Sequence, residues 1–362
     1  MKFLTLEKEA FGLDISDLSL KIIKLKKRGE LFSLVSSYEM EIKAGIIEKG
    51  VVQDEDALAK IIKVACKEVV GEKLNTKYVI ASLPEEKSFL QVIQMPKMDE
   101  TELKSAILFE AENYIPLPMS EVYLDFQTIR PIKDHLNHLD VLIVAMPKKI
   151  VNSYVASIKK AGLIPIALEV ESEAIVRALV KNETSNSPMV LIDFGRNSTD
   201  FIIFAGRSIQ FTCSIPVSSE QLTVAISTSL EIDLKKAERL KIKYTLSDIN
   251  NNARSKKILE AMNPILNDLV AQIKKYLNFY QDHTSHEHIS SDERIQKILM
   301  CGGGANLAGL PKLLSEKLGI PVELSDFWIN FSPTRKNKHM YQNYLSFATA
   351  LGLALRGIKD NT

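Results

Sequence analysis

Apolar and polar residues alternate over residues 11–42 and again over residues 189–217. A period of two is typical of β-strands, and the short polar turns between the apolar runs favour antiparallel hairpins. Each stretch therefore predicts a three-stranded meander, the first with a turn at Gly29. In both, an aspartate stands where the first strand ends, Asp14 in one and Asp193 in the other. This repeated pattern predicts a duplicated α/β core with a cleft between two similar halves.

Helical spacing of apolar residues and further strand patterns fill the rest of the chain. Helices are predicted at 54–70, 99–114, 148–161, 171–182, 218–230, 234–243, 255–283 and 342–356. Strands are predicted at 78–84, 88–96, 121–130, 140–147 and 164–170, a linker at 183–188, and a strand, glycine-rich turn, helix and strand within 294–324. The expected division is a first core subdomain over 1–84, completed by 163–188 and 341–362; an inserted α+β subdomain over 85–162; a second core subdomain over 189–217, completed by 296–340; and a helical subdomain over 218–295.

Charge and cysteine content narrow the class of protein. The 362 residues include 46 Lys+Arg and 45 Asp+Glu, a formal net charge of +1. A chain so close to neutral has no overall positive charge that would attract it to nucleic acid or anionic lipid. Three cysteines far apart argue against a disulfide framework and fit a reducing compartment. The start lacks the apolar run of a signal peptide, and residues 345–355 have about half the length of a membrane span. We therefore expect a cytoplasmic protein that does not bind nucleic acid.

Three turns have the chemistry of a phosphate site. In the first aspartate turn (14–21) and the second aspartate turn (193–199), backbone N–H groups and hydroxyls stand beside a carboxylate. Successive N–H groups form an anion-binding concavity, and a hydrated Mg²⁺ between Asp14 and Asp193 would offset their repulsion of phosphate. The glycine-rich turn (301–310) lets a ligand approach the backbone closely. Each turn alone is also an ordinary structural turn.

Taken in this order, the three turns resemble the phosphate 1, phosphate 2 and adenosine motifs of the actin-like ATPase superfamily. The resemblance implies a ribonuclease H-like duplicated two-domain fold and ATP or ADP with Mg²⁺ as cofactors. It also implies that Asp14 and Asp193 contact the Mg²⁺ ion through bound water molecules. The nucleotide residues that it implies are Asp14, Ser16, Asp17, Leu18, Ser19 and Lys21 in the first turn, Asp193, Gly195, Asn197, Ser198 and Thr199 in the second, Glu238 and Lys241 at the ribose, and Gly302, Gly303, Gly304 and Asn306 at the adenosine.

The inserted subdomain carries a more specific resemblance. FEAENYIPLP (109–118) and AGLIP (161–165) are similar to the PilM family of type IV pilus assembly proteins, and the similarity runs from Phe11 to Arg356. It implies a scaffold of the inner-membrane assembly complex that binds the N-terminal cytoplasmic tail of a PilN-like membrane protein. The chain would then reach the membrane only through this partner; the pilus motor ATPase and self-association are further implied contacts. The predicted peptide-binding residues are Leu90, Val92, Ile93, Met95, Tyr114, Ile115 and Pro116.

The sequence also departs from the superfamily pattern. Ser16 replaces the usual glycine, and Asp17 adds a carboxylate that is unfavourable near phosphate unless it points outward or helps hold the metal. No residue is identified as the activator of an attacking water; Glu171, at the head of a predicted helix, has helix capping as its plainer role. The expected activity is at most a weak ATPase. An FtsA-like division filament protein, a nucleotide-free adaptor and a small-molecule kinase stay open as alternatives.

Overall fold

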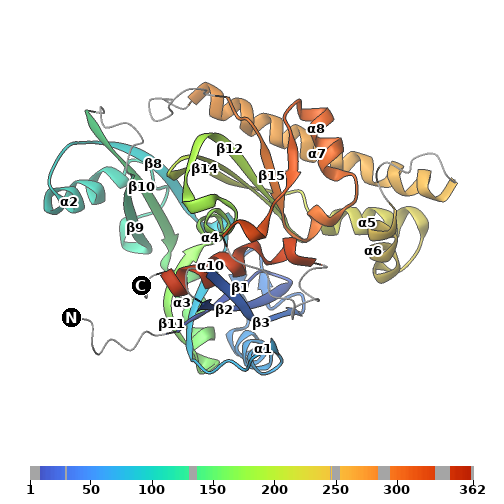
Figure 1. The fold of residues 1–362 in the computed structure, drawn as a ribbon, viewed down its shortest axis with the longest axis horizontal. Helices are drawn as coiled ribbons and strands as arrows, with labels where there is room; N and C mark the ends of the chain where they lie inside the picture. The colour runs from blue at the N-terminus through green and yellow to red at the C-terminus, as the bar shows by residue number, and fades with distance from the viewer. Residues whose placement is uncertain are drawn as a thin grey trace.

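The computed structural model describes residues 9–28, 31–129, 137–244, 246, 253–283, 294–330 and 343–359. The predicted turn at Gly29 and the predicted helix start at residue 342 lie outside these ranges. The described chain forms two large sheets, one below and one above the centre of Figure 1, and a smaller sheet at their side.

The lower sheet is a meander extended by parallel strands. Its order is β11-β7-β1-β2-β3-β6; β2 pairs antiparallel with β1 and β3, whereas β7 pairs parallel with β1 and β11. Its strands are β1 (Phe11–Ile15), β2 (Ser19–Arg28), β3 (Leu31–Glu41), β6 (Val70–Gly71), β7 (Tyr78–Leu83) and β11 (Ile164–Val170). A short hairpin, β4 (Ile47–Glu48) and β5 (Val51–Val52), precedes α1 (Glu55–Lys67), which packs beside α3 (Lys148–Lys160).

The upper sheet repeats this plan, as the sequence predicted. Its order is β14-β13-β12-β15-β16, an antiparallel meander followed by two parallel strands. The strands are β12 (Ser185–Phe194), β13 (Thr199–Gly206), β14 (Ser208–Ile215), β15 (Ile298–Cys301) and β16 (Val322–Leu324). The helices of this half are α5 (Ser219–Leu230), α6 (Leu234–Lys243), α7 (Ala253–His283) and α8 (Leu310–Leu318).

The inserted segment forms a three-stranded sheet of order β8-β10-β9 with one helix on it. Its elements are β8 (Phe89–Pro96), α2 (Glu100–Ala111), β9 (Val122–Ile129) and β10 (His138–Pro147). Because residues alternate between the faces of a strand, Val141 and Ile143 of β10 pack under α2 whereas Leu142 and Val144 face the opposite way.

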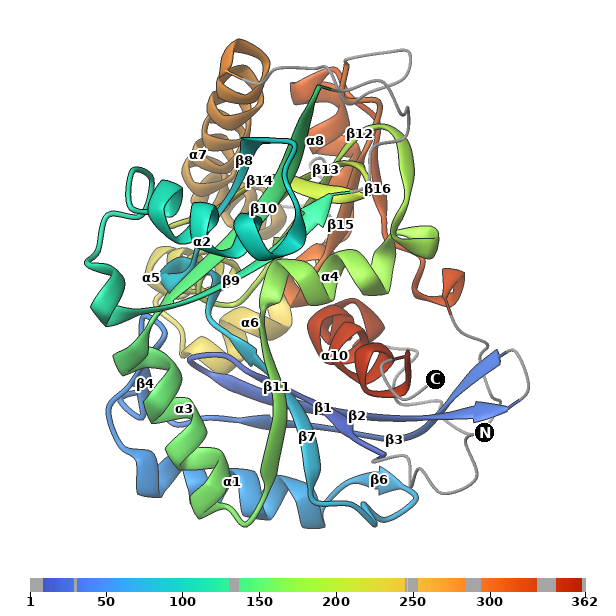
Figure 2. The same ribbon diagram turned by 90° about the vertical axis from the view of Figure 1, so that its left-hand side faces the viewer.

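Two helices lie between the large sheets (Figure 2): α4 (Glu171–Leu179) and α10 (Ala348–Lys359). They cross so closely that a Cβ on Gly352 would stand 1.8 Å from the carbonyl oxygen of Ala174. On the other side of α10, a Cβ on Gly12 of β1 would stand 2.3 Å from the oxygen of Ala350. Small residues at these crossings therefore hold the two halves together.

The structure corrects the predicted elements at three places. Within the predicted final helix, Tyr344–Phe347 form a 3₁₀ turn, and the α-helix begins only at Ala348. Strand β12 begins at Ser185 and takes up most of the linker expected at 183–188. The glycine-rich turn does not itself open a helix, because a 3₁₀ turn at Gly303–Asn306 intervenes and α8 begins after Gly309, whose φ is 87°. Local patterns do not distinguish one turn of 3₁₀ helix from the start of an α-helix.

Candidate functional site

The two halves enclose a cleft of about 1030 Å³ that brings the three turns together. Every nucleotide residue predicted from the sequence lines this cleft except Thr199. Thr199 is buried, and its hydroxyl donates to the carbonyl oxygen of Val217 at 2.6 Å, so it holds the start of β13 in place.

The first aspartate turn carries a buried cation of the cleft wall, Lys21. The Lys21 ammonium lies 3.5 Å from the Asp14 carboxylate and donates to the Ser19 hydroxyl at 2.9 Å. Asp14 also accepts from the Ser82 hydroxyl at 3.1 Å. Burial lowers the pKa of Lys21, but the carboxylates of Asp14, Glu39 and Asp193 outweigh it and raise that pKa overall. Lys21 is therefore a fixed positive charge on the cleft wall.

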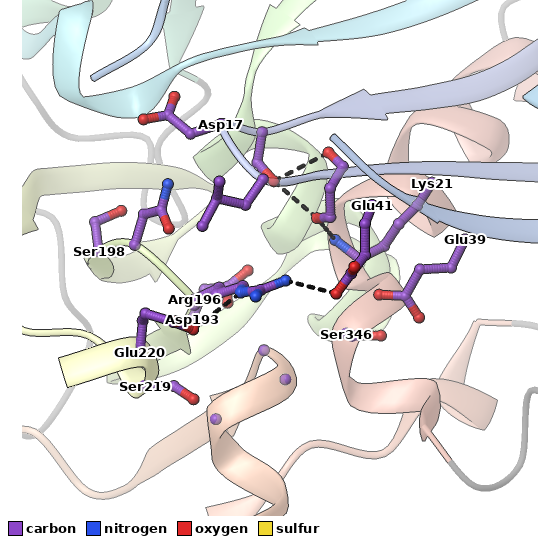
Figure 3. Close-up of a pocket in the computed structure, with 18 of the residues that line it drawn as sticks. Asp17, Lys21, Glu39, Glu41, Asp193, Arg196, Ser198, Ser219, Glu220 and Ser346 are labelled. Carbon is purple, nitrogen blue, oxygen red and sulfur yellow. Dashed lines mark hydrogen bonds and ion pairs between the residues drawn. The ribbon is translucent and has the colours of Figure 1, made fainter. Parts of the chain in front are cut away.

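Asp17 points away from the other charged residues labelled in Figure 3. Its carboxylate accepts from the backbone N–H groups of Lys49 at 2.7 Å and Gly50 at 2.9 Å, in the turn between β4 and β5. Asp17 still lines the cleft, but the two N–H groups partly satisfy its charge, which reduces its repulsion of phosphate.

The glycine-rich turn packs directly on the second aspartate turn. A Cβ on Gly302 would stand 2.2 Å from Oδ1 of Asp193, and one on Gly304 would stand 2.6 Å from the ring of Phe194. Gly303 has more room, with Ser346 Cβ at 3.9 Å. Two of the three glycines are thus needed for packing alone, whatever ligand the cleft holds.

The predicted ribose pair is not a solvent-facing ion pair. Lys241 is buried, and its ammonium donates to the oxygen and hydroxyl of Ser219 at 3.0 and 2.8 Å and to the Thr223 hydroxyl at 2.8 Å. It lies 2.7 Å from Glu238. Lys241 therefore fastens α6 to α5, and the half-exposed Glu238 is the member of the pair that a ligand can reach.

Polar bridges cross the mouth of the cleft. The Arg196 guanidinium contacts Glu41 of the lower half and Glu220 of its own half, each at 3.0 Å (Figure 3). Asn343 donates to Glu39 at 3.3 Å and accepts from Asn306 at 3.0 Å. Two points of contact thus join the walls on which a ligand would sit.

A second cavity, of about 560 Å³, lies between the inserted subdomain and the lower half; we call it the groove. Among the described residues, β9 and β11 are the end strands of their sheets, and both line it. Its remaining wall comes from β7, β10, α3, α4 and α10 and from Glu183. The residues of the inserted sheet on its wall include Tyr123, Asp125, Gln127, Leu142, Val144 and Met146.

The predicted peptide residues divide between two faces. Leu90 and Val92 pair with Val144 and Leu142, so they share the sheet face of the groove, although they do not line it. Ile93, Met95 and Ile115 are buried with α2 in the core of the inserted subdomain, beyond the reach of a peptide in this structure. Tyr114 and Pro116 are exposed at the end of α2, also outside the groove lining.

A family model described as type IV pilus assembly protein PilM matches residues 12–358. The chain belongs to the PilM family. A solved structure described as the PilM–PilN type IV pilus biogenesis complex is 27% identical, has a TM-score of 0.81, and is matched over 97% of this chain and 99% of that chain. The cell division protein FtsA of Streptococcus pneumoniae is 22% identical over 349 residues, which are 86% of this chain and 74% of the relative.

More distant structures confirm the predicted actin-like fold of this PilM-family chain. MreB5 of Spiroplasma citri, solved with bound ADP, is 13% identical with a TM-score of 0.55, over 97% of this chain and 96% of that chain. Within the described residues, the PilM-family chain has no helix that is both long and apolar enough to span a membrane.

Several carboxyl groups that line the cleft were not predicted as ligands, and two of them, Asp200 and Glu171, have strongly raised pKa values. Asp200 is paired with Asp193 across β12 and β13, and its Oδ1 is buried without a hydrogen-bond partner. Burial, then the charges of Glu85 and Asp193, raise the pKa of Asp200 well above its usual range. Its place one residue after Thr199, opposite Asp193 across a hairpin, is the signal that could have found it.

Glu171 is the second of these groups, and it does not cap its helix. Its carboxylate accepts from the N–H of Glu85 at 3.1 Å, and the N-cap position of α4 is Val170. Burial, then the charges of Asp200 and Asp14, raise the pKa of Glu171 well above its usual range. Burial and the neighbouring carboxylates therefore favour the neutral forms of Glu171 and Asp200 in the ligand-free chain.

The groove of the PilM-family chain is strongly charged on its α4 side. Arg177 and Arg356 hold the buried Glu169 carboxylate at 2.5 and 2.6 Å. Burial and the Glu169 charge raise the pKa of the neighbouring Glu173 to about 7, against the lowering effect of the two arginines. A carboxyl group that titrates near neutrality therefore faces the groove.

Glu173→Gln is expected to stabilise the chain above pH 7. An acid whose pKa is raised by folding destabilises the native state progressively from its unfolded pKa, 4.5, to its folded value of about 7. The variant lacks this cost, so its free energy of unfolding should exceed that of the wild type by about 3 kcal/mol at pH 8 and nearly equal it at pH 4.5. Urea unfolding at both pH values measures the difference. Glu112→Gln, at the exposed end of α2, is the control, and an equal gain there would contradict the argument.

Proposed function

We propose that the chain is an ATP-binding scaffold whose groove holds the N-terminal cytoplasmic segment of a PilN-like membrane protein. The observation that carries the proposal is the groove itself, which lies between the edges of β9 and β11. An extended peptide can add to a sheet edge through main-chain hydrogen bonds and place alternate side chains in pockets. The solved relative described as a PilM–PilN complex supports a partner of this class.

The cleft has groups suited to a nucleotide with Mg²⁺. Lys21 supplies a fixed cation, and the two aspartate turns supply N–H groups and hydroxyls for phosphate oxygens. Asp14 and Asp193 come from opposite halves, and burial raises the pKa of Asp193 to about 6, with Lys21 lowering it and Asp14 adding to the rise. Such a pair fits a hydrated divalent ion, which would favour both ionised forms. Bound Mg²⁺ would neutralise phosphate charge.

ATP serves in this proposal mainly as a bound ligand. Hydrolysis needs a positioned water and a group that takes its proton. The carboxyl groups nearest this role, Glu171 and Asp200, have pKa values raised well above their usual range, mainly by burial. We therefore expect the chain to hydrolyse ATP slowly or not at all. Through its partner, the chain would work at the inner face of the cell membrane.

The test is titration of the chain with a synthetic peptide of the PilN-like N-terminal segment. Val144→Asp places a charge on the groove face, and we expect it to weaken peptide binding at least about tenfold. Tyr114→Asp, at the exposed end of α2 outside the groove lining, is the matched control and should bind as the wild type does. Circular dichroism checks that both variants fold.

Two results would overturn the groove as the peptide site. One is wild-type affinity in Val144→Asp. The other is loss of binding in Tyr114→Asp alone, which would move the peptide to the α2 end.

A further inference from the structure

The turn at Lys49–Gly50, between β4 and β5, contacts both the first aspartate turn and the inserted subdomain. On one side, its two N–H groups hold the Asp17 carboxylate at 2.7 and 2.9 Å. Both residues have positive φ, 49° and 70°, so the turn presents these N–H groups to a single acceptor. The position of the first aspartate turn is therefore linked to a hairpin more than thirty residues away.

On its other side, the turn meets both connections to the inserted subdomain. The chain leaves the lower sheet at Pro84, and a Cβ on Gly50 would stand 2.8 Å from Pro84 Cβ. The chain returns through α3, which follows β10 directly. Tyr154 of α3 is fully buried, and its hydroxyl donates to the carbonyl oxygen of Gly50 at 3.3 Å.

The same helix reaches the groove. Val151 lines the groove one turn before Tyr154 on α3, and positions three residues apart lie on the same side of a helix. A continuous set of contacts thus runs from Asp17 through Gly50 and Tyr154 to Val151. It joins the wall of the cleft to the wall of the groove without crossing solvent.

We propose that the Lys49–Gly50 turn couples the two cavities, so that a nucleotide in the cleft changes the affinity of the groove for its peptide. Asp17 and Tyr154 both line the cleft, and in this proposal they act as positioning residues through their hydrogen bonds to the turn. A nucleotide that shifts the first aspartate turn moves the Asp17 carboxylate, and with it the turn against which α3 and Pro84 pack. By reciprocity, the peptide changes nucleotide affinity by the same factor. The inference rests on the proposed function, since it needs both ligands.

The decisive measurement is the peptide dissociation constant with and without saturating Mg-ATP. In the wild type we expect the two values to differ at least about fivefold. Tyr154→Phe removes one hydroxyl and keeps the ring, so the ratio, measured against the variant's own affinity for each ligand alone, should fall to within about twofold of unity. Tyr280→Phe, a buried tyrosine of α7 in the other half, is the matched control and should keep the wild-type ratio.

A ratio of one in the wild type, or an unchanged ratio in Tyr154→Phe, overturns the coupling and leaves the proposed function standing. If either ligand fails to bind on its own, both the coupling and the proposed function are overturned. A second measurement needs no ligand: Asp17→Ala should speed amide hydrogen exchange in the turn and in α3, because the turn loses its acceptor. Wild-type exchange in Asp17→Ala would also contradict the link.

Discussion

Gly352→Ala is expected to be the most damaging single-methyl substitution at the contact of the two halves. The new Cβ would stand 1.8 Å from the carbonyl oxygen of Ala174 and 2.4 Å from its carbonyl carbon, both backbone atoms of α4. Neither atom can rotate away, so α10 and α4 must separate. Alanine favours a helix by about 1 kcal/mol over glycine, but overpacking of this severity costs about 4 kcal/mol or more. We expect a thermal midpoint lower by roughly 10 °C, measured by circular dichroism.

Gly357→Ala, on the same helix, is the matched control. Its Cβ would stand 3.2 Å from the Cβ of Ala10 and 3.5 Å from the end of the Ile80 side chain, so small adjustments relieve the contact. This variant should melt within a few degrees of the wild type. Equal midpoints for the two variants would show that α4 and α10 are not held at the separation seen here.

Asp193→Asn is expected to have opposite effects on stability and on ligand binding. Burial raises the pKa of Asp193 from 3.8 to about 6, so its ionised form destabilises the ligand-free protein above that pH. The neutral amide removes this cost. At pH 7.5 the free energy of unfolding of the ligand-free variant should therefore rise by about 3 kcal/mol, with a higher thermal midpoint. The amide cannot supply the charge that favours a hydrated Mg²⁺, so Mg-ATP affinity should fall at least about 100-fold.

Calorimetric titration and thermal shift with Mg-ATP measure both effects. Asp233→Asn is the control, because Asp233 caps α6 and asparagine caps a helix equally well. Failure of the wild type to bind Mg-ATP at millimolar concentration would favour the nucleotide-free adaptor. If Asp193→Asn is destabilised but still binds Mg-ATP, the Asp193 carboxylate stabilises the fold and does not hold the metal ion.

The sequence located the cleft better than the groove. The three turns are local patterns of aspartate, glycine and hydroxyl residues at strand ends, and strands of a duplicated core carry such ends to the same place. Strand β8 offered no such guide, because it is apolar on both of its faces. Strand β8 has α2 on one side and the lower half on the other, so its sequence shows no clear alternation of apolar and polar residues. The sequence therefore could not show that Ile93 faces α2 whereas Val92 faces the other way.

The sequence by itself therefore determined the duplicated core, the inserted subdomain, the family and the identity of the cleft turns, because all of these depend on periodicity and motifs within short stretches. Tertiary structure alone decided what individual side chains do. Asp17 turns toward the Lys49–Gly50 turn because two N–H groups of that turn donate to its carboxylate, and Lys241 turns inward because α5 surrounds its ammonium. Each of these partners lies far along the chain, and a charged side chain takes the orientation in which its charge is best satisfied.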